Sequence, residues 1–161
     1  MVARHGKAEQ YGAEDHRRPL TERGRRQARD AGEWLAASGF VPTHALVSSA
    51  TRTRESWEAL LVGSGSSAQA EISDSAYAAD TETVLTLLQG APEEALVLAF
   101  VGHNPTVSSL VHLLDSGRPD PTAFRALSFG LPTSGVAVLE LTTSWHDLEL
   151  GSARLVAGRT P

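Results

Sequence analysis

Three short segments of the sequence carry residue types that suit phosphoryl transfer. They are Arg4-His5-Gly6, Ser48-Ser49-Ala50-Thr51-Arg52 and Gly102-His103-Asn104-Pro105. An arginine guanidinium presents a rigid fork of N–H groups that matches phosphate oxygens, and a neutral imidazole can attack phosphorus. Backbone N–H groups at the start of a helix near Asn104 would add a further anion-binding group. If these segments meet, two arginines could stabilise a phosphoryl group beside two histidines.

Each segment also has a simpler interpretation when it is taken alone. An Arg-His pair by itself says little about chemistry, and Gly-His-Asn-Pro could be a helix cap beside a structural histidine. Arg52 could form a surface ion pair with Glu55 or Glu58. It is the order and spacing of all three segments together that favour a functional site.

Each segment follows a predicted strand, which would bring all three to one edge of a sheet. The apolar run 95–101 is typical of a strand buried on both faces of a parallel sheet. Further strands are predicted at 1–4, 45–48, 71–73, 135–142 and 148–156. Helices are predicted at 22–38, 51–61, 80–89 and 105–114, with Thr21 and Asn104 as N-caps, Gly39 as a C-terminal stop and a helical turn near Phe124. The alternation predicts an α/β sandwich with a mostly parallel sheet, in which ligands bind at the carboxyl ends of the strands.

Length and composition narrow the class of protein. The chain has 161 residues and a mass of 17.1 kDa, which suits one domain over residues 1–161. It contains no cysteine, so disulfides, thiol catalysis, iron–sulfur clusters and thiolate zinc sites are excluded. No apolar run is long enough to span a membrane and the N-terminus lacks the apolar core of a signal peptide, so we expect a cytoplasmic protein without a membrane partner.

The net charge of −5 conceals an asymmetry along the chain. Residues 1–30 hold eight basic and five acidic residues, whereas the remainder holds six basic and fourteen acidic ones. The acidic total argues against nucleic-acid binding. The basic N-terminal segment predicts an anion site or a docking surface near that end, although a solvated helix face that carries Arg23, Arg25, Arg26 and Arg29 explains it equally.

The same segments carry a resemblance to a known family. Arg4-His5-Gly6, the spacing from Ser48 to Arg52, and the later His103 resemble the histidine phosphatase superfamily, which has the phosphoglycerate mutase-like fold. More narrowly, residues 4–9 (RHGKAE), 18–24 (RPLTERG) and 101–105 (VGHNP) look like the SixA-type phosphohistidine phosphatases. The resemblance implies a three-layer α/β/α sandwich with a mostly parallel central sheet.

The resemblance also implies roles for individual residues. His5 would be the nucleophile that becomes phosphorylated, and Arg4, Arg52 and His103 would hold the phosphoryl oxygens. Asn104 could touch phosphate too, or simply cap its helix. Arginine and histidine would take the place of a magnesium ion, so neither a metal nor another cofactor is expected. The histidines also lack the close pairwise spacing of a zinc site.

Two departures from the family pattern stand out. Only Met1-Val2-Ala3 precede Arg4, whereas relatives begin with a full apolar strand, so either the first strand is short or the natural chain starts elsewhere. Larger members protonate the leaving group with a carboxylic acid, and Ala78 stands about where that acid is expected. Asp15, Asp74 and Asp80 are weaker candidates for this general acid, which we leave unassigned. His16 is expected at the surface and His112 partly packed.

The missing acid favours a phosphohistidine substrate. An imidazole leaving group needs less help from a proton donor than an alkoxide does, because its conjugate acid has a pKa near 6.5. The resemblance thus implies a phosphorylated protein substrate, such as a histidine-phosphotransfer domain, with phosphate or another oxyanion in the site. Alternatives are a phosphomonoesterase for a small metabolite on the same fold and a non-catalytic phosphate-binding adaptor.

Overall fold

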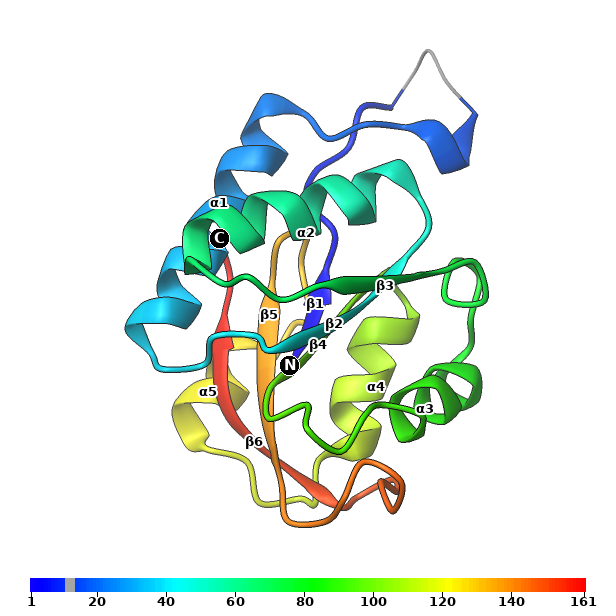
Figure 1. The fold of residues 1–161 in the computed structure, drawn as a ribbon. Helices are drawn as coiled ribbons and strands as arrows, with labels where there is room; N and C mark the ends of the chain where they lie inside the picture. The colour runs from blue at the N-terminus through cyan, green and yellow to red at the C-terminus, as the bar shows by residue number, and fades with distance from the viewer. Residues whose placement is uncertain (11–13) are drawn as a thin grey trace.

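A six-stranded sheet, in the order β3-β2-β4-β1-β5-β6, forms the centre of the protein (Figure 1). The computed structural model describes residues 1–10 and 14–161. The strands are β1 (Val2–Arg4), β2 (His44–Ser48), β3 (Ala70–Ser73), β4 (Leu98–Gly102), β5 (Val136–Leu141) and β6 (Ala153–Arg159). The pairs β1–β4, β2–β3 and β2–β4 are parallel, and β1–β5 and β5–β6 are antiparallel. The prediction of a mostly parallel sheet is confirmed.

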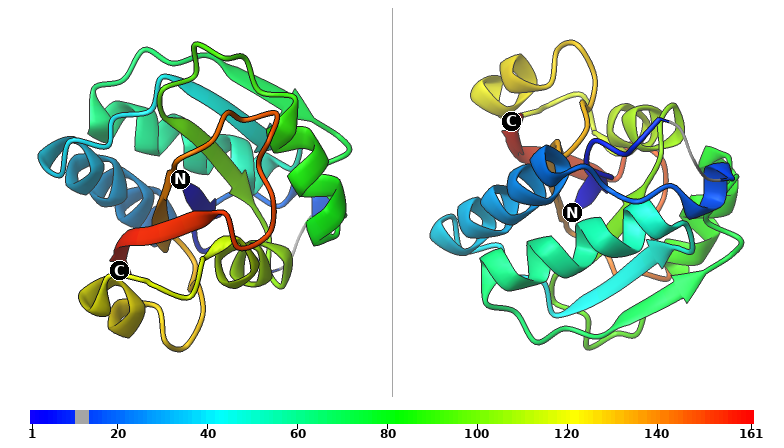
Figure 2. Two further views of the ribbon diagram at one scale, coloured as in Figure 1. Left: turned by 90° about the horizontal axis from the view of Figure 1, so that it is seen from below. Right: turned by 90° about the horizontal axis from the view of Figure 1, so that it is seen from above.

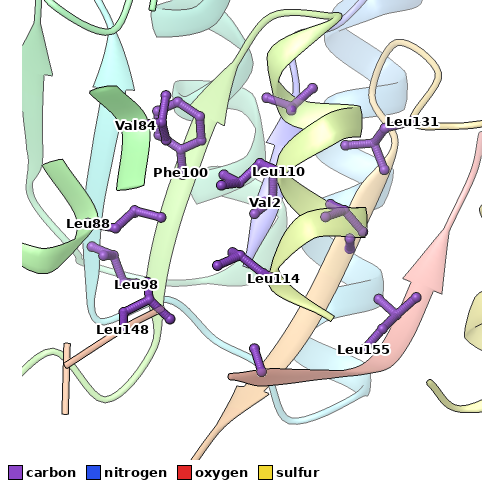
Figure 3. Packing of buried hydrophobic residues seen from close by; sticks show 14 of the residues in the cluster. Val2, Val84, Leu88, Leu98, Phe100, Leu110, Leu114, Leu131, Leu148 and Leu155 are labelled. Atoms are coloured by element: carbon purple, nitrogen blue, oxygen red, sulfur yellow. The ribbon is translucent and has the colours of Figure 1, made fainter. Parts of the chain in front are cut away.

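Helices cover both faces of this sheet, which gives three layers (Figures 1 and 2). The helices are the short 3-10 helix η1 (Asp15–Arg17), α1 (Glu22–Ala37), α2 (Thr51–Ser64), α3 (Thr81–Gln89), α4 (Thr106–Leu114) and α5 (Pro121–Ala126). Alternate residues of each strand face opposite layers, because side chains alternate along a strand. In β4, Phe100 packs with the residues of α3, α4 and α5, whereas Val101 packs with those of α1 and α2. Figure 3 shows the first of these two cores.

Glycines allow α1 and α2 to pack closely. A side chain at Gly32 would collide with the backbone oxygen of Leu60, and one at Gly63 with that of Arg29. This packing explains why α2 continues to Ser64 instead of ending near residue 61 as predicted. It ends at Gly65, whose φ of 64° lies in the left-handed region that favours glycine.

The short first strand has a central place in the sheet. β1 has only three residues, as its sequence predicts, yet it pairs with β4 on one side and β5 on the other. The backbone N–H of Arg4 donates to the oxygen of Gly135, and that of His5 donates to the oxygen of Gly102. The Arg4-His5 segment is thus hydrogen-bonded to the chain on both sides.

Some predicted boundaries are wrong for local reasons. Strand β4 begins at Leu98 and not at residue 95, because Ala95 lies in a turn where its N–H donates to Pro92 and its oxygen accepts from the Trp145 indole. Strand β6 runs from Ala153 to Arg159 instead of 148–156, because a turn with Gly151 at a φ of 75° precedes it. In the part of the chain that the structure describes, no helix is long and apolar enough to cross a bilayer.

Candidate active site

His5 follows β1 with its ring oriented by its own turn. Its Nδ1 donates to the backbone oxygen of Gly6 at 2.7 Å, because a carbonyl oxygen can only accept. The proton therefore sits on Nδ1, which leaves the lone pair on Nε2. Burial, reinforced by the nearby charges of Arg52 and Arg4, lowers the pKa of His5 to about 4, although the Gly6 hydrogen bond opposes this shift. His5 is neutral at physiological pH, as a nucleophile must be.

His103 approaches His5 from the end of β4, with ring centres 5.1 Å apart. Its Nε2 shares a 2.8 Å hydrogen bond with the hydroxyl of Ser48, which ends the neighbouring strand β2. Its Nδ1 is buried and has no partner among the described residues. Burial, together with the neighbouring His5 and the charge of Arg52, lowers the pKa of His103 to about 3. A bound anion would act in the opposite direction and favour the imidazolium form.

Arg4 and Arg52 both place a positive charge near His5, whose pKa both of them lower. Arg52 lies in the first turn of α2 and is only 6% exposed. Arg4 ends β1, and its Nη1 donates to the oxygen of Leu131 at 3.2 Å. Within residues 1–10 and 14–161, the Nε atoms of both arginines are buried without a hydrogen-bond acceptor. Buried N–H groups are normally paired, so these two atoms are candidate donors to an acceptor outside the described residues.

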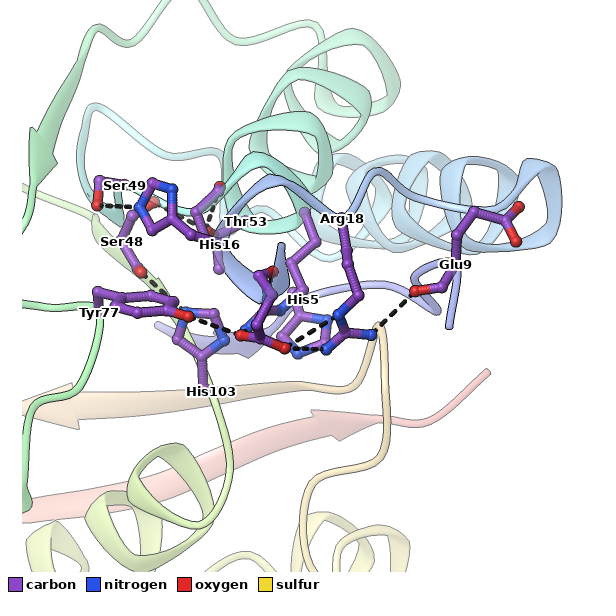
Figure 4. A network of polar contacts seen from close by, with 12 residues as sticks. His5, Glu9, His16, Arg18, Ser48, Ser49, Thr53, Tyr77 and His103 are labelled. Carbon is purple, nitrogen blue, oxygen red and sulfur yellow. Dashed lines mark hydrogen bonds and ion pairs between the residues drawn. The ribbon is translucent and has the colours of Figure 1, made fainter. Parts of the chain in front are cut away.

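Asp15 completes the outer side of this cluster. The Nη1 of Arg52 donates to the backbone oxygen of Asp15 at 2.6 Å, and the Nη2 of Arg52 donates to the carboxylate of Asp15 at 3.1 Å. The interpretation of Arg52 as a surface partner of Glu55 or Glu58 is therefore wrong. The carboxylate also accepts from Arg18 and from the Tyr77 hydroxyl (Figure 4). These hydrogen bonds hold the pKa of Asp15 well below its usual value, and the one from Tyr77 has the largest effect.

Tyr77, Arg18 and His16 are site residues that the motifs did not reveal. The Tyr77 ring lies edge-on to His103, with centres 5.6 Å apart, and edge-on to His16 at 4.7 Å. The Nε2 of His16 shares a 2.9 Å hydrogen bond with Ser49, so His16 is half-buried instead of free at the surface. The only signal for Tyr77 was its place in the 74–80 segment, where the general acid of larger relatives was sought.

The remaining candidates lie elsewhere. Asp74 is exposed, and Asp80 is exposed and caps α3 by accepting from the N–H of Thr83. The sequence predicted Asn104 as the N-cap of α4, and this prediction is wrong, because Pro105 occupies that position. The Asn104 side chain instead donates to the oxygen of Leu131, the same oxygen that Arg4 contacts, and accepts from Ser108.

Two further observations complete the inventory of side chains. His112 is exposed on α4, not partly packed. No three histidine, cysteine, aspartate or glutamate side chains of the described ranges are grouped as metal ligands would be.

The chain is similar to several known proteins. The profile of the histidine phosphatase superfamily (branch 1) matches residues 1–75. An uncharacterised protein of Mycobacterium tuberculosis is 38% identical over 151 residues, which cover 93% of each chain. A SixA structure from Agrobacterium tumefaciens superposes with a TM-score of 0.80 at 30% identity, over 99% of this chain and 96% of its own. The protein histidine phosphatase SixA complexed with tungstate also gives 0.80, at 25% identity over 99% of this chain and 95% of its own.

Proposed function

The chain belongs to the histidine phosphatase superfamily, and from that premise we propose that it is a metal-independent phosphatase that acts on phosphohistidine in a cytoplasmic protein. One observation carries the proposal. The buried nitrogens Arg4 Nε, Arg52 Nε and His103 Nδ1 have no partner within the described part of the chain, and they gather around a neutral His5. Such a set of nitrogens suits the oxygens of a phosphoryl group.

The geometry suggests two steps. In the first, the lone pair on His5 Nε2 forms a bond to phosphorus as the bond to the leaving group breaks. In the second, water attacks phosphorus as the bond to His5 Nε2 breaks, and the protons of the water leave with the phosphate. His5 leaves as a neutral imidazole because Nδ1 keeps the proton that it donates to the oxygen of Gly6. Arg4, Arg52 and a protonated His103 stabilise the charge on the phosphoryl oxygens in both steps.

The choice of a phosphohistidine substrate rests on the leaving group. The candidate carboxylates do not supply a ready proton: Asp15, at the site, is held ionised, and Asp80 lies elsewhere and caps α3. An ester oxygen would leave poorly without a donor, whereas a ring nitrogen needs little help. The likeness to SixA structures points the same way, and a histidine-phosphotransfer domain is the substrate we expect.

The proposal is tested by comparing the wild-type enzyme with His5→Ala on a phosphorylated histidine-phosphotransfer domain and on p-nitrophenyl phosphate. His146→Ala is a matched control, because His146 is an exposed histidine in another loop. We expect His5→Ala to abolish turnover of the phosphoprotein, His146→Ala to retain it, and a chelator to have no effect. Turnover that survives His5→Ala contradicts the nucleophile, and turnover lost to a chelator contradicts the metal-free mechanism.

The same assay separates the alternatives. Hydrolysis of p-nitrophenyl phosphate but not of the phosphoprotein would indicate a phosphomonoesterase for a small metabolite. Activity on neither substrate, with phosphate still bound, would indicate a phosphate-binding adaptor.

A further inference from the structure

The Asp15 carboxylate is an anion placed beside an anion-binding pocket. Its side chain is 57% exposed, yet four hydrogen bonds hold it: from the Tyr77 hydroxyl at 2.6 Å, from Arg18 Nη2 at 2.6 Å and Nε at 3.0 Å, and from Arg52 Nη2 at 3.1 Å. Arg52 thus uses two of its nitrogens for Asp15 and leaves Nε without a described partner. The Tyr77 hydroxyl donates to Asp15 and its ring packs edge-on to His103, so Tyr77 connects the two residues (Figure 4).

A fixed negative charge here opposes phosphate binding. Like charges near each other raise the free energy of the complex, so Asp15 weakens the pull of the two arginines on any phosphate. Holding Arg52 in place does not require a charge, because its Nη1 donates to the backbone oxygen of Asp15 and a neutral amide oxygen could accept the one hydrogen bond from its Nη2. Arg18 and Arg52 balance the carboxylate in the free protein, and a positive charge in the substrate itself would be a further partner for it.

A phosphorylated imidazole supplies such a charge. When one ring nitrogen carries phosphorus, the other can carry a proton, and the ring is then cationic. Resting on the proposed function, we propose that Asp15 is a specificity-determining residue: its exposed negative charge stabilises the protonated ring of the substrate phosphohistidine and so selects phosphorus bonded to nitrogen over phosphorus bonded to ester oxygen. The exposure of Asp15 fits this role, because a protein substrate can reach only side chains at the surface.

The transfer step balances with this protonation state. His5 Nε2 gives its electron pair to phosphorus, and the pair of the breaking phosphorus–nitrogen bond returns to the substrate ring. That ring keeps the proton on its other nitrogen and leaves as neutral imidazole. Asp15 gains and loses no proton; it stabilises the cationic form from which the ring departs. With an ester, charge on the leaving oxygen becomes negative, and Asp15 opposes it.

The competing explanation is that Asp15 only positions Arg52. Asp15→Asn separates the two, because asparagine removes the charge and keeps an oxygen that can accept from Arg52 or Tyr77. Three quantities are measured: kcat/KM for the phosphorylated histidine-phosphotransfer domain, kcat/KM for p-nitrophenyl phosphate, and the calorimetric Kd for inorganic phosphate. Asp74→Asn is the matched control, since Asp74 is an exposed aspartate in the segment that carries Tyr77.

We expect Asp15→Asn to lower kcat/KM for the phosphoprotein by about 10- to 100-fold, the scale of an interaction between opposite charges in a partly exposed site. In the same variant, kcat/KM for p-nitrophenyl phosphate rises and inorganic phosphate binds about fivefold more tightly at low salt. Asp74→Asn behaves as the wild type in all three. Tyr77→Phe keeps the charge of Asp15 and removes one hydrogen bond to it, so kcat/KM for the phosphoprotein falls less than in Asp15→Asn.

Opposite results overturn the inference. If Asp15→Asn weakens phosphate binding and slows both substrates equally, Asp15 is only a positioning residue. If Asp15→Asn does not fold, the Tyr77→Phe variant replaces it. An equal fall in kcat/KM for both substrates in Tyr77→Phe leads to the same conclusion. Failure of the proposed function looks different: the wild-type enzyme itself then leaves the phosphoprotein untouched, before any variant is compared.

Discussion

Ser48 Oγ and His103 Nε2 lie 2.8 Å apart, and this hydrogen bond joins the ends of two neighbouring parallel strands. Ser48 is fully buried at the end of β2, and His103 follows the end of β4. The bond uses Nε2 of the imidazole, so Nδ1, which is buried without a described partner, is left to bind the proposed phosphate. A serine that is not in contact with the proposed phosphate thus sets the orientation of a residue that is.

Ser48→Ala should therefore impair activity without unfolding the protein. The ring of His103 loses its only described side-chain partner, and we expect kcat/KM to fall about tenfold, which corresponds to one hydrogen bond. Ser116→Ala, at an exposed position, serves as the control for loss of a hydroxyl. A Ser48→Ala variant with wild-type kcat/KM would show that packing alone orients His103.

Arg52→Lys should reduce activity much more. Lysine presents its three N–H donors from one nitrogen atom, so it cannot reproduce the guanidinium fork whose separate nitrogens reach two oxygens of Asp15 and leave a further donor for phosphate. We expect kcat/KM to fall by about 100-fold or more, on the scale of a lost transition-state donor. The matched control is Arg54→Lys, two residues further along the same helix at an exposed position, which should keep the wild-type rate. Equal rates for both variants would argue against a role for the Arg52 guanidinium.

The neutral histidines should make stability depend on pH. The pKa is about 4 for His5 and about 3 for His103 in the folded protein, whereas unfolding restores both to about 6.5. Below pH 6.5 the unfolded chain takes up protons that the folded chain does not, so the free energy of unfolding decreases as pH falls towards 4. Above pH 6.5 this contribution is fully present.

His103→Asn should remove part of that dependence. Between pH 7.5 and pH 4.5, we expect the variant to lose about 1–2 kcal/mol less unfolding free energy than the wild type, as measured by urea denaturation. His146→Asn, at an exposed position, should follow the wild type. The attribution is wrong if His103→Asn and the wild type have the same slope.

Gly63→Ala should destabilise the packing of α1 against α2. The added methyl group would meet the backbone of Arg29 and Glu33, which cannot move as a flexible side chain can. We expect the free energy of unfolding to fall by about 1–3 kcal/mol, the range for overpacking. Gly90→Ala is the control, because the nearest atom to its methyl group would lie 3.5 Å away, an ordinary contact. Equal stability of the two variants would mean that the helices separate at little cost.

The sequence was sufficient to predict the elements that hold the catalytic motifs. Arg4, His5, Arg52 and His103 each stand at or just after the end of a strand, and the carboxyl ends of parallel strands meet at one edge of a sheet. Local patterns therefore predicted their convergence. Thr21 as the N-cap of α1 and Gly39 as its stop were likewise local, and both predictions are confirmed.

What the sequence did not reveal depends on contacts between distant segments. Tyr77 and Asp15 are 62 positions apart and meet only because the 74–80 segment and the 14–18 segment lie over the same pocket. Asn104 has the side chain of a typical N-cap, but its amide group donates instead to the backbone oxygen of Leu131, which is 27 positions away in the sequence. No periodicity in either segment encodes these partners, so composition and spacing could not predict them.

The position of β1 between a parallel and an antiparallel neighbour has a kinetic consequence. The amide of His5 donates to Gly102 and its carbonyl accepts from Ser134, so the proposed nucleophile is joined to both sides of the sheet. Its amide proton becomes free only when this segment separates from the end of β4, in the middle of the sheet. We expect that proton to exchange with solvent at the rate of the well-protected core amides. The proposed nucleophile would then be among the slowest residues to exchange its backbone proton with water.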